Sequence, residues 1–584
     1  MNPRRTLASL LPEPGRPSIP DPEGRRRHAI ETGRTRLLVA SVVFVLAFGV
    51  IGARLIHLTA FGEAGEPRFA QASRDRTAPV ERADIQDRNG VVLVSSLPAA
   101  SLYADPSRVM DPAEAARQLV SIFPDMDRVG LLAKLTSKGR FVWIRRNLTP
   151  NQQYEINRLG IPGLAFQRTE RRIYPFGRML SHVLGLTDVD GNGVSGLEKE
   201  FDAVLSGEET PLRLSIDIRL QAMLESELGS AVRTFKAVGA AGVVMDVRTG
   251  EVVALTSLPD FDPNRPETGR GNAAFNRATK GVYELGSAFK LFTAAMALDS
   301  GAAKLTDRYD TSQPIRVARF TIDDYHGQKR WLTFPEVLIH SSNIGAAKMA
   351  LDVGGKTQRD YLRRFGLLDA ASIELPEIGT PLYPSPWRDI NTMTISYGHG
   401  IAVSPLQLTA AVAALTNGGI LHAPTLLMQE EKSEVATEKN KHVRVISEAT
   451  SEKMRSLMRL VVTKGTGKNG SAPGYRVGGK TGTADKQRGG GYSEQALISS
   501  FVGAFPIHDP RYVIFVVLDE PKGNAMTAGY ATGGWVAAPS VGRLVTRMAP
   551  MMGLFPKEGP REKQYPKPGR GLFTPVFHGT SGAR

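Results

Sequence analysis

The chain has 584 residues, of which 41% are hydrophobic and 22% are charged, so it is long enough for two or more full-sized domains and too apolar to be disordered throughout. Its net charge of +15 suits a negatively charged surface such as anionic lipid or an acidic polymer, but no nucleic-acid-binding motif accompanies the charge, and we expect no nucleic-acid partner. The lack of cysteine excludes disulfides, thiolate catalysis and cysteine-ligated metal sites.

The N-terminal region predicts a tail followed by a membrane anchor. Residues 1–36 are rich in Arg, Pro and Gly without periodicity, and we expect a disordered basic tail. Residues 37–53 carry no charge, and residues 55–58 can extend the apolar run if Arg54 snorkels. The alternatives are a cleaved signal peptide and a buried soluble helix. The long basic region and the lack of a small-x-small cleavage site argue against cleavage, so we expect one retained anchor over 37–58, with a cytoplasmic N-terminus.

The region from residue 59 to 210 is mixed in composition, and the character of the chain changes near residue 214. Within it, Asn89-Gly90 is a turn signal before the apolar run 91–94, which predicts a hairpin. A second hairpin is predicted over residues 240–256, where two β-rich runs flank a turn at residues 248–250.

The remainder of the chain alternates between helical and β-rich patterns. A helix apolar nearly all round is predicted over residues 287–298, and mostly helical sequence continues to about residue 420. Residues 429–442 are a charged run, most simply a solvated loop, and two strands are predicted at 496–505 and 511–518. Hairpin, helices and strands in this order predict an α+β domain, a five-stranded antiparallel sheet flanked by helices.

Ser287 and Lys290 lie three residues apart at the start of the predicted apolar helix. On a helix they share one face, and burial favours the neutral amine of Lys290, which could accept a proton from the serine beside it. The pair alone is a weak signal, because a helix-capping serine followed by a solvated lysine has the same spacing.

Two further short segments have ordinary structural explanations when they are taken alone. Ser341-Ser342-Asn343 could open a helix as an N-cap, and Lys480-Thr481-Gly482-Thr483 could be a glycine-containing turn. Ser-x-x-Lys, Ser-x-Asn and Lys-Thr-Gly in that order, the last before the terminal strands, are together the signature set of penicillin-interacting serine acyltransferases.

Beyond these triplets, the chain from about residue 37 to 550 resembles the class B penicillin-binding proteins. Residues 82–90, 172–175 and 196–198 resemble motifs of that family's non-catalytic domain, with Ala83 where glycine is usual, and residues 246–251 and 397–400 fit its catalytic domain. Residues 323–326 and 340–345 look most like the cell-division (FtsI-type) branch. The resemblance implies an elongated α/β pedestal or dimerisation domain at 59–210, a penicillin-binding transpeptidase domain at 211–555 and a flexible tail at 556–584.

The resemblance also implies an activity, that of a serine-type peptidoglycan D,D-transpeptidase that cross-links stem peptides ending in D-Ala-D-Ala. Ser287 would be the nucleophile, Lys290 its base and Ser341 a proton relay, while Asn343 would hold the substrate amide and orient Lys290. The substrate carboxylate would be held by Lys480, Thr481 and Thr483, and the backbone N–H groups of Ser287 and Thr483 would form the oxyanion hole. Gly482 would let the substrate approach the strand edge. No metal or cofactor is expected.

The same resemblance implies septal duty, inhibition by β-lactams, and partners that include a membrane-embedded glycan polymerase and other division proteins. It places the catalytic domain on the periplasmic side of the inner membrane. The alternatives are an elongation-type transpeptidase, a β-lactamase or D,D-carboxypeptidase, and a membrane-anchored β-lactam sensor or scaffold. No glutamate with a local signature for activating a deacylating water is present, which disfavours the hydrolases.

Overall fold

The computed structural model describes residues 38–53, 82–207, 210–317, 320–428, 443–488 and 491–556 of two units, one ending at Pro79 and one beginning at Val80. In the first unit, residues 38–53 are helical and their large apolar side chains are exposed, Phe48 by 68%. Among the described residues, no helix combines the length and apolar character that a membrane crossing requires. The remainder of the expected anchor, both expected tails apart from Pro556, and the charged run 429–442 lie outside the described residues.

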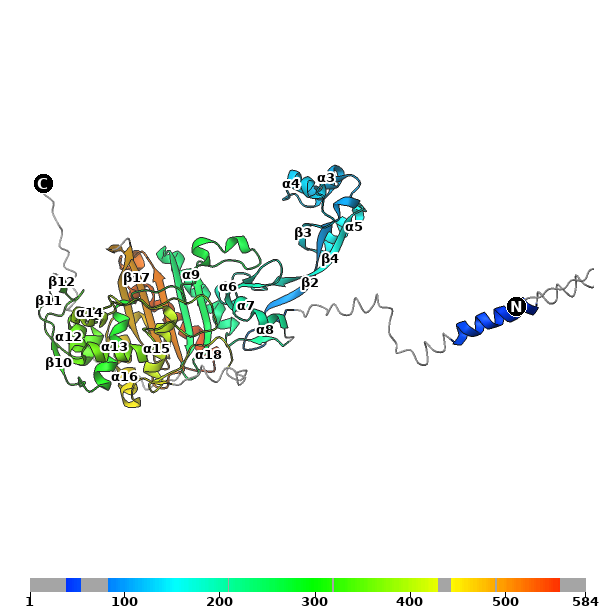
Figure 1. The fold of residues 1–584 in the computed structure, drawn as a ribbon. Helices are drawn as coiled ribbons and strands as arrows, with labels where there is room; N and C mark the ends of the chain where they lie inside the picture. Colours follow the sequence, from blue (N-terminus) through cyan, green and yellow to red (C-terminus); the bar gives the residue numbers. More distant parts are fainter. Residues whose placement is uncertain are drawn as a thin grey trace, which may run out of the picture. The chain divides into compact units, whose positions relative to one another are not determined.

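The second unit begins with a small sheet built around one long strand, β2, which joins two groups of elements. Near its start β2 pairs with β1, and along its length it pairs with β4 on one side and, near its end, with β3 on the other. Three helices pack beside the end of β2 and share a hydrophobic cluster with it (Figure 1). The elements of this part are β1 Ile85–Gln86, β2 Val92–Ala104, α3 Pro112–Ile122, α4 Arg128–Leu135, β3 Val142–Leu148, α5 Pro150–Leu159, β4 Leu164–Ile173 and β7 Leu212–Arg213.

Three motifs that are far apart in the sequence meet where this part joins the rest. The carboxylate of Glu198, which is fully buried, accepts from Arg82 Nε and from Arg172 Nε, both at 2.7 Å. Removing one partner from such a buried ion pair leaves an uncompensated charge, so these residues act as a unit. Next to them, the backbone N–H of Tyr174 donates to Asn264 Oδ1, and Asn264 Nδ2 donates to the carbonyl oxygen of Tyr174. The elements here are α6 Ser181–Leu184, β5 Leu186–Thr187, β6 Gly193–Ser195, α7 Gly196–Glu200 and α8 Asp202–Gly207.

The larger part of the second unit is organised around a five-stranded sheet of order β16-β17-β18-β8-β9, in which every neighbouring pair is antiparallel. The predicted five-stranded antiparallel sheet is therefore confirmed. Its strands are β8 Gly239–Asp246, β9 Val252–Leu258, β16 Gly478–Arg488, β17 Gly491–Phe505 and β18 Tyr512–Asp519. Strand β16, which carries the Lys-Thr-Gly segment, is an edge strand.

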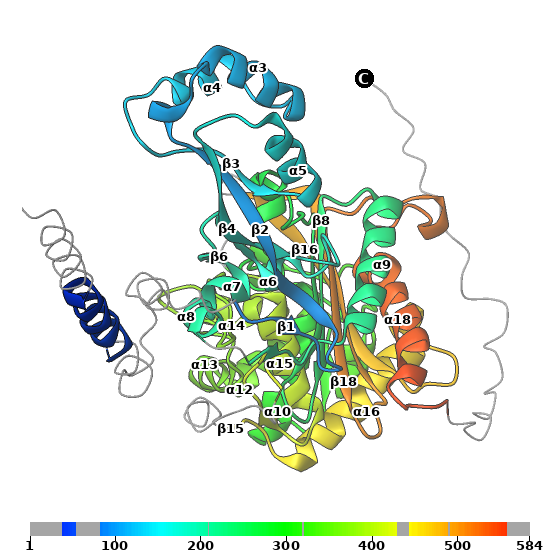
Figure 2. The ribbon, with the colours of Figure 1, turned by 90° about the vertical axis from the view of Figure 1, so that its right-hand side faces the viewer.

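Helices cover both faces of this sheet (Figure 2). Along β18 the side chains alternate, so Phe515 points into one hydrophobic cluster and Ile514 into the other. Burial on both faces explains why the sequence of β18 is almost continuously apolar. One face is covered by α9 Ile218–Phe235 and α18 Ala538–Met551, and the other by α15 Pro405–Thr416 and α16 Glu448–Lys464, against which α10 Lys290–Asp299 packs.

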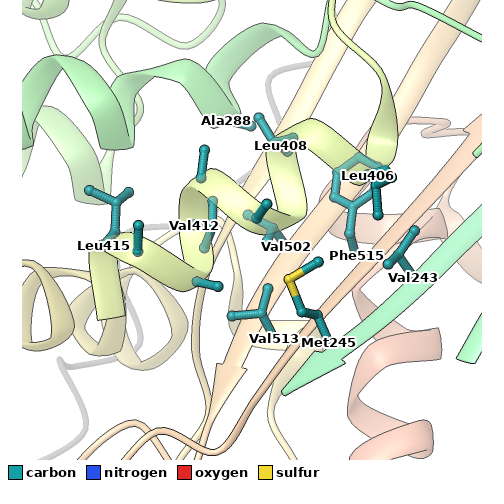
Figure 3. Close-up of a cluster of buried hydrophobic side chains, with 14 of the residues drawn as sticks. Val243, Met245, Ala288, Leu406, Leu408, Val412, Leu415, Val502, Val513 and Phe515 are labelled. Atoms are coloured by element: carbon teal, nitrogen blue, oxygen red, sulfur yellow. The ribbon is translucent and has the colours of Figure 1, made fainter. Parts of the chain in front are cut away.

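Helix α15 lies between the sheet and the turn that carries Ser287. It starts at a capping box, in which Ser404 and Gln407 satisfy each other's backbone N–H groups and proline occupies the first turn. Every residue of α15 is buried, and Figure 3 shows Leu406 and Val412 over the strands while Leu408 lies beside Ala288. The residue next to Ser287 is thus held against the core.

The remaining elements form a helical group with short two-stranded ribbons. The helices of this group are α11 Phe334–Ile339, α12 Asn343–Val353, α13 Gly355–Arg364 and α14 Asp389–Ile395, whereas the short α17 Gly533–Val536 packs against β16, β17 and α18. The ribbons pair β10 Arg308–Asp310 with β13 Trp331–Thr333, β11 Ile315–Val317 with β12 Phe320–Ile322, and β14 Ile420–Leu421 with β15 Val443–Arg444.

Most local predictions are confirmed, and two boundaries are wrong, since the strand predicted from residue 496 begins at Gly491. The hairpins at Asn89-Gly90 and over 240–256 are present, as are the strands at 496–505 and 511–518. The helix predicted from residue 287 begins instead at Lys290, because residues 286–289 form a tighter 3-10 turn with Gly286 in a left-handed conformation.

The two-sided core generates a stability prediction. Phe515 is fully buried on a central strand, so Phe515→Ala should lower the free energy of unfolding by about 3–5 kcal/mol, since it removes apolar contacts and leaves a cavity. Urea denaturation of the variant and the parent measures this. As a control, Met526→Ala at a 74% exposed position should change the free energy of unfolding by no more than about 0.5 kcal/mol. Equal losses in both variants would contradict this description of the core.

Candidate active site

Ser287 and Lys290 come together because of the 3-10 turn that precedes α10. In a 3-10 turn, side chains three residues apart eclipse each other, and Ser287 Oγ lies 3.0 Å from Lys290 Nζ. Lys290 is only 1% exposed, and every residue from Lys290 to Leu298 is buried. The prediction of a buried helix is confirmed, and the alternative of a capping serine with a solvated lysine is wrong.

The residue before Ser287 has no room for a β-carbon. Gly286 has φ of +53°, and a β-carbon on it would lie 2.3 Å from the carbonyl oxygen of Thr483 on β16. A β-carbon on Gly482 would likewise lie 2.4 Å from the carbonyl oxygen of Leu285. The turn and the edge strand therefore pack backbone against backbone, which brings Thr483 next to Ser287.

The second segment approaches Lys290 from the turn between α11 and α12. Lys290 Nζ donates to the carbonyl oxygen of Ser341 at 2.5 Å and to Asn343 Oδ1 at 2.7 Å, and lies 3.2 Å from Ser341 Oγ. Ser341 has φ of +59°, an unusual conformation for a residue with a β-carbon. Ser342 caps α12 by accepting from Gly345 N at 2.9 Å. The N-cap explanation of this segment is thus correct, and the residues on either side of the cap face Lys290.

The third segment lies on β16, and the turn proposed as its alternative explanation is wrong. Lys480 is fully buried, and its Nζ donates to Ser341 Oγ at 2.9 Å and to the carbonyl oxygen of Thr481 at 3.2 Å. Ser341 Oγ therefore lies between two lysine amines. The structure brings all three segments together, although Lys480 and Ser341 are 139 residues apart in sequence.

The two threonines of the third segment both have partners within the protein. Thr481 is 7% exposed and its hydroxyl lies 2.8 Å from that of Thr466. Thr483 is half-buried, and its hydroxyl accepts from the backbone N–H of Gly533 at 3.1 Å. Both side chains are held in fixed orientations along the strand edge.

Burial changes the protonation of both lysines. Burial, helped by the nearby charge of Lys480 and opposed by Asp324, holds the pKa of Lys290 well below its usual value. Burial also lowers the pKa of Lys480, to about 7. A neutral Lys290 can donate its two N–H groups to the acceptors on Ser341 and Asn343 and turn its lone pair toward the hydroxyl of Ser287. This is the arrangement of a nucleophile with its base already in contact.

Two family models together match most of the chain. Residues 240–545 match the penicillin binding protein transpeptidase domain, and residues 77–217 match the penicillin-binding protein dimerisation domain. A probable peptidoglycan D,D-transpeptidase FtsI of Caulobacter vibrioides is 38% identical over 559 residues, which is 91% of this chain and 92% of the relative. The chain belongs to the class B penicillin-binding proteins.

Two further comparisons support the family and the fold of this class B penicillin-binding protein. The peptidoglycan D,D-transpeptidase FtsI of Escherichia coli is 30% identical over 575 residues, covering 92% of this chain and 95% of the relative. A solved structure of penicillin-binding protein 3 from Mycobacterium tuberculosis, complexed with aztreonam, matches with a TM-score of 0.65 and 24% identity over 82% of this chain and 98% of that one. The expected transpeptidase fold with a preceding dimerisation domain is confirmed.

Sequence reasoning missed several residues that shape the site of this penicillin-binding protein. Asp324 accepts from the Ser342 hydroxyl and from two backbone N–H groups at the start of α12. Glu284 accepts from Gly400 N at 3.0 Å, and a β-carbon on Gly398 would lie 2.2 Å from the carbonyl oxygen of Gly286. Thr466 holds Thr481. Of these residues, Asp324 and Gly398 lie in segments that resemble motifs of the family. That resemblance is the signal that could have drawn attention to them.

The close packing at Gly286 generates a prediction. Gly286→Ala should reduce the rate of penicillin acylation by roughly 100-fold, because the added methyl group pushes the turn that carries Ser287 away from β16 and a displacement of about 1 Å has such an effect. Stopped-flow or gel measurements with a fluorescent penicillin report the rate. Gly301→Ala is the matched control, since Gly301 also has a left-handed φ of +76° but has open space around it. Near-normal acylation by Gly286→Ala would contradict the packing argument.

The two lysines generate a pH prediction. Acylation of the free enzyme should follow a bell-shaped pH profile, falling at low pH as Lys290 gains a proton and falling at high pH as Lys480, with a pKa of about 7, loses its charge. The second-order rate constant for a fluorescent penicillin, measured across pH, checks this. If the rate constant instead stays level up to about pH 10.4, the pKa of an exposed lysine, the fall at high pH is not caused by loss of charge at a buried Lys480.

Proposed function

We propose that this protein is a peptidoglycan D,D-transpeptidase that cross-links stem peptides through an acyl-enzyme on Ser287 during septal wall synthesis. The observation that carries the proposal is the 3.0 Å contact between Ser287 Oγ and the buried amine of Lys290, with Ser341 and Lys480 beside it. The septal assignment is supported by the relatives from Caulobacter vibrioides and Escherichia coli named FtsI.

The first step is acylation by the donor stem peptide. Lys290 Nζ takes the proton of the Ser287 hydroxyl as Oγ attacks the carbonyl carbon of the penultimate D-Ala, and the oxygen of that carbonyl becomes negatively charged. Backbone N–H groups of Ser287 and Thr483 stabilise this oxyanion, a role supported by the contact between residue 286 and β16. The tetrahedral intermediate collapses by breaking the C–N bond to the terminal D-Ala.

The leaving amine must receive a proton, and Ser341 is suited to supply it. Its Oγ lies 3.2 Å from Lys290 Nζ and 2.9 Å from Lys480 Nζ, so a proton lost by Ser287 can pass from Lys290 through Ser341 to the departing nitrogen. Asn343 binds the substrate amide and keeps Lys290 in place through its Oδ1. The second step reverses the first: an amine of a neighbouring stem peptide attacks the acyl carbon and loses a proton to Lys290. The bond from the acyl carbon to Ser287 Oγ then breaks, and Lys290 returns the proton to Oγ.

Recognition of the donor depends on the carboxylate of its terminal D-Ala. Lys480 supplies positive charge at the strand edge, and Thr481 and Thr483 supply hydroxyl groups. Gly482 leaves the edge of β16 free of a side chain, so an extended peptide can lie along it. β-Lactams inhibit the enzyme because ring opening by Ser287 leaves the amine attached to the acyl group, and it remains near the site.

The anchor and the domain limits are also proposals. The exposed apolar surface of the helix over 38–53 supports a single membrane anchor at 37–58, with the transpeptidase domain in the periplasm and the N-terminus in the cytoplasm. We assign residues 59–210 to the non-catalytic domain, 211–555 to the transpeptidase domain, and the terminal segments 1–36 and 556–584 to tails. A membrane-embedded glycan polymerase and other division proteins are the proposed partners.

An elongation-type transpeptidase would share all of this chemistry, and the cellular position of a fluorescent fusion distinguishes the two: midcell for septal duty and the side wall for elongation. A β-lactamase or carboxypeptidase would pass the acyl group to water, and a sensor or scaffold would not need turnover. Persistence of the penicilloyl-enzyme over hours contradicts a β-lactamase. Loss of cross-linking in cells that carry only Ser287→Ala contradicts a pure scaffold.

The catalytic proposal predicts a single covalent adduct. After treatment of the full-length protein with penicillin, mass spectrometry of the digest should find one penicilloyl group, on the peptide that contains Ser287, and Ser287→Ala should carry none. Ser300→Ala, at the other end of α10, is the matched control and should acylate at the parent rate. An adduct on any other residue, or unchanged labelling of Ser287→Ala, would overturn the proposed function.

A further inference from the structure

The loop after β12 holds the turn that carries Ser341 and Asn343. Asp324, in this loop, receives three hydrogen bonds from the start of α12: from the Ser342 hydroxyl at 2.7 Å, from Asn343 N at 2.5 Å and from Ile344 N at 3.0 Å. Hydrogen bonds to an ionised carboxylate are roughly twice as strong as neutral ones. Here they satisfy N–H groups that a helix leaves unpaired in its first turn.

The residue before Asp324 determines which way the amide of Asn343 points. The carbonyl oxygen of Asp323 accepts from Asn343 Nδ2 at 2.9 Å. Because an amide has its donor and its acceptor on opposite sides, this bond turns Oδ1 toward Lys290, whose Nζ donates to it at 2.7 Å. One short loop therefore holds both the backbone and the side chain of Asn343.

The turn that this loop holds is not one that the chain adopts readily. Ser341 has a left-handed φ of +59°, and in this conformation it presents both its carbonyl oxygen and its hydroxyl to Lys290. A non-glycine residue stays in this conformation only where the surrounding structure enforces it. Immediately after Ser341, Asp324 accepts from each of the next three residues, and Ser342 N donates to the carbonyl oxygen of Val337 at 2.9 Å, so these bonds hold the chain on that side of Ser341.

We propose that Asp324 is a positioning residue for acylation: its carboxylate holds the turn from Ser341 to Asn343, and thereby sets the positions of the two acceptors that orient the Lys290 amine toward Ser287. This inference rests on the proposed function and goes beyond it, because Asp324 is placed outside the set of groups that contact substrate. It acts through Ser341 and Asn343.

The charge of Asp324 also bears on the protonation of Lys290. The charged and titratable groups that act on Lys290 are Lys480 on β16, which disfavours its protonated form, and Asp324, which favours it; His399, in the loop after α14, lies within range of Lys290 as well. Removing the negative charge of Asp324 therefore lowers the pKa of Lys290 further. A residue with a purely structural role would not move this property of the site.

The test measures fluorescent-penicillin acylation of the full-length protein in Asp324→Ala and Asp324→Asn across pH, together with thermal unfolding. Asp111→Ala is the matched control, because Asp111 also accepts from two backbone N–H groups, those of Ala113 and Glu114, at the start of a helix with the same number of residues as α12, and it lies outside the site. We expect Asp324→Ala to acylate roughly 10- to 100-fold more slowly at the pH optimum. Asp324→Asn, which keeps an acceptor but no charge, should retain more activity, and its acidic limb should move to lower pH. Asp111→Ala should acylate normally while losing a similar amount of thermal stability.

Acylation of Asp324→Ala and Asp324→Asn at the parent rate with an unshifted acidic limb would overturn the inference. If Asp324→Ala does not fold, the rate and the acidic limb of Asp324→Asn decide the question. Failure of the inference is distinguishable from failure of the proposed function, because in the first case the parent protein still carries its adduct on Ser287, and in the second case it does not.

Discussion

The site depends on keeping one lysine amine, that of Lys290, buried and held by acceptors. Its Nζ has Ser287 Oγ at 3.0 Å, the carbonyl oxygen of Ser341 at 2.5 Å and Asn343 Oδ1 at 2.7 Å. An isolated charge at this depth is costly, and a second lysine nearby increases the cost, so the neutral form is favoured. The same burial that makes a charged lysine costly here suits Lys290 to the role of base that we propose for it.

The surrounding architecture holds those groups at fixed distances. The turn that carries Ser287 is packed against the core through Ala288 and α15, while glycines at 286 and 482 let it meet the edge strand backbone to backbone. The sheet is buried on both faces, so β16 has a fixed position. Precision of this kind is easier to obtain from strands and helices than from loops. The loop at Asp323 and Asp324 is itself tied to the start of α12 by four hydrogen bonds.

The non-catalytic part is joined to this scaffold by buried charge. Glu198 between Arg82 and Arg172 gathers three motifs from different points in the sequence, and Gly196 N donates to the carboxylate of Glu377 in the catalytic part at 3.3 Å. Buried ion pairs contribute little net stability when compared with apolar contacts, but they tolerate few other arrangements. They suit a junction whose geometry must be specific.

By itself the sequence determined the local features: both hairpins, the two terminal strands, the apolar helix, and the pairing of Ser287 with Lys290. Each follows from residues that are close together in the chain. It also indicated, through the order of three short segments, which distant residues belong to one site. Only the tertiary structure decided how they meet: that Ser287 lies in a 3-10 turn, that Ser341 is left-handed with its hydroxyl between two lysines, and that Asp324 holds the turn. The reason is physical, since these contacts join residues up to 139 positions apart, and their geometry depends on strand register and two-sided core packing, which local patterns do not encode.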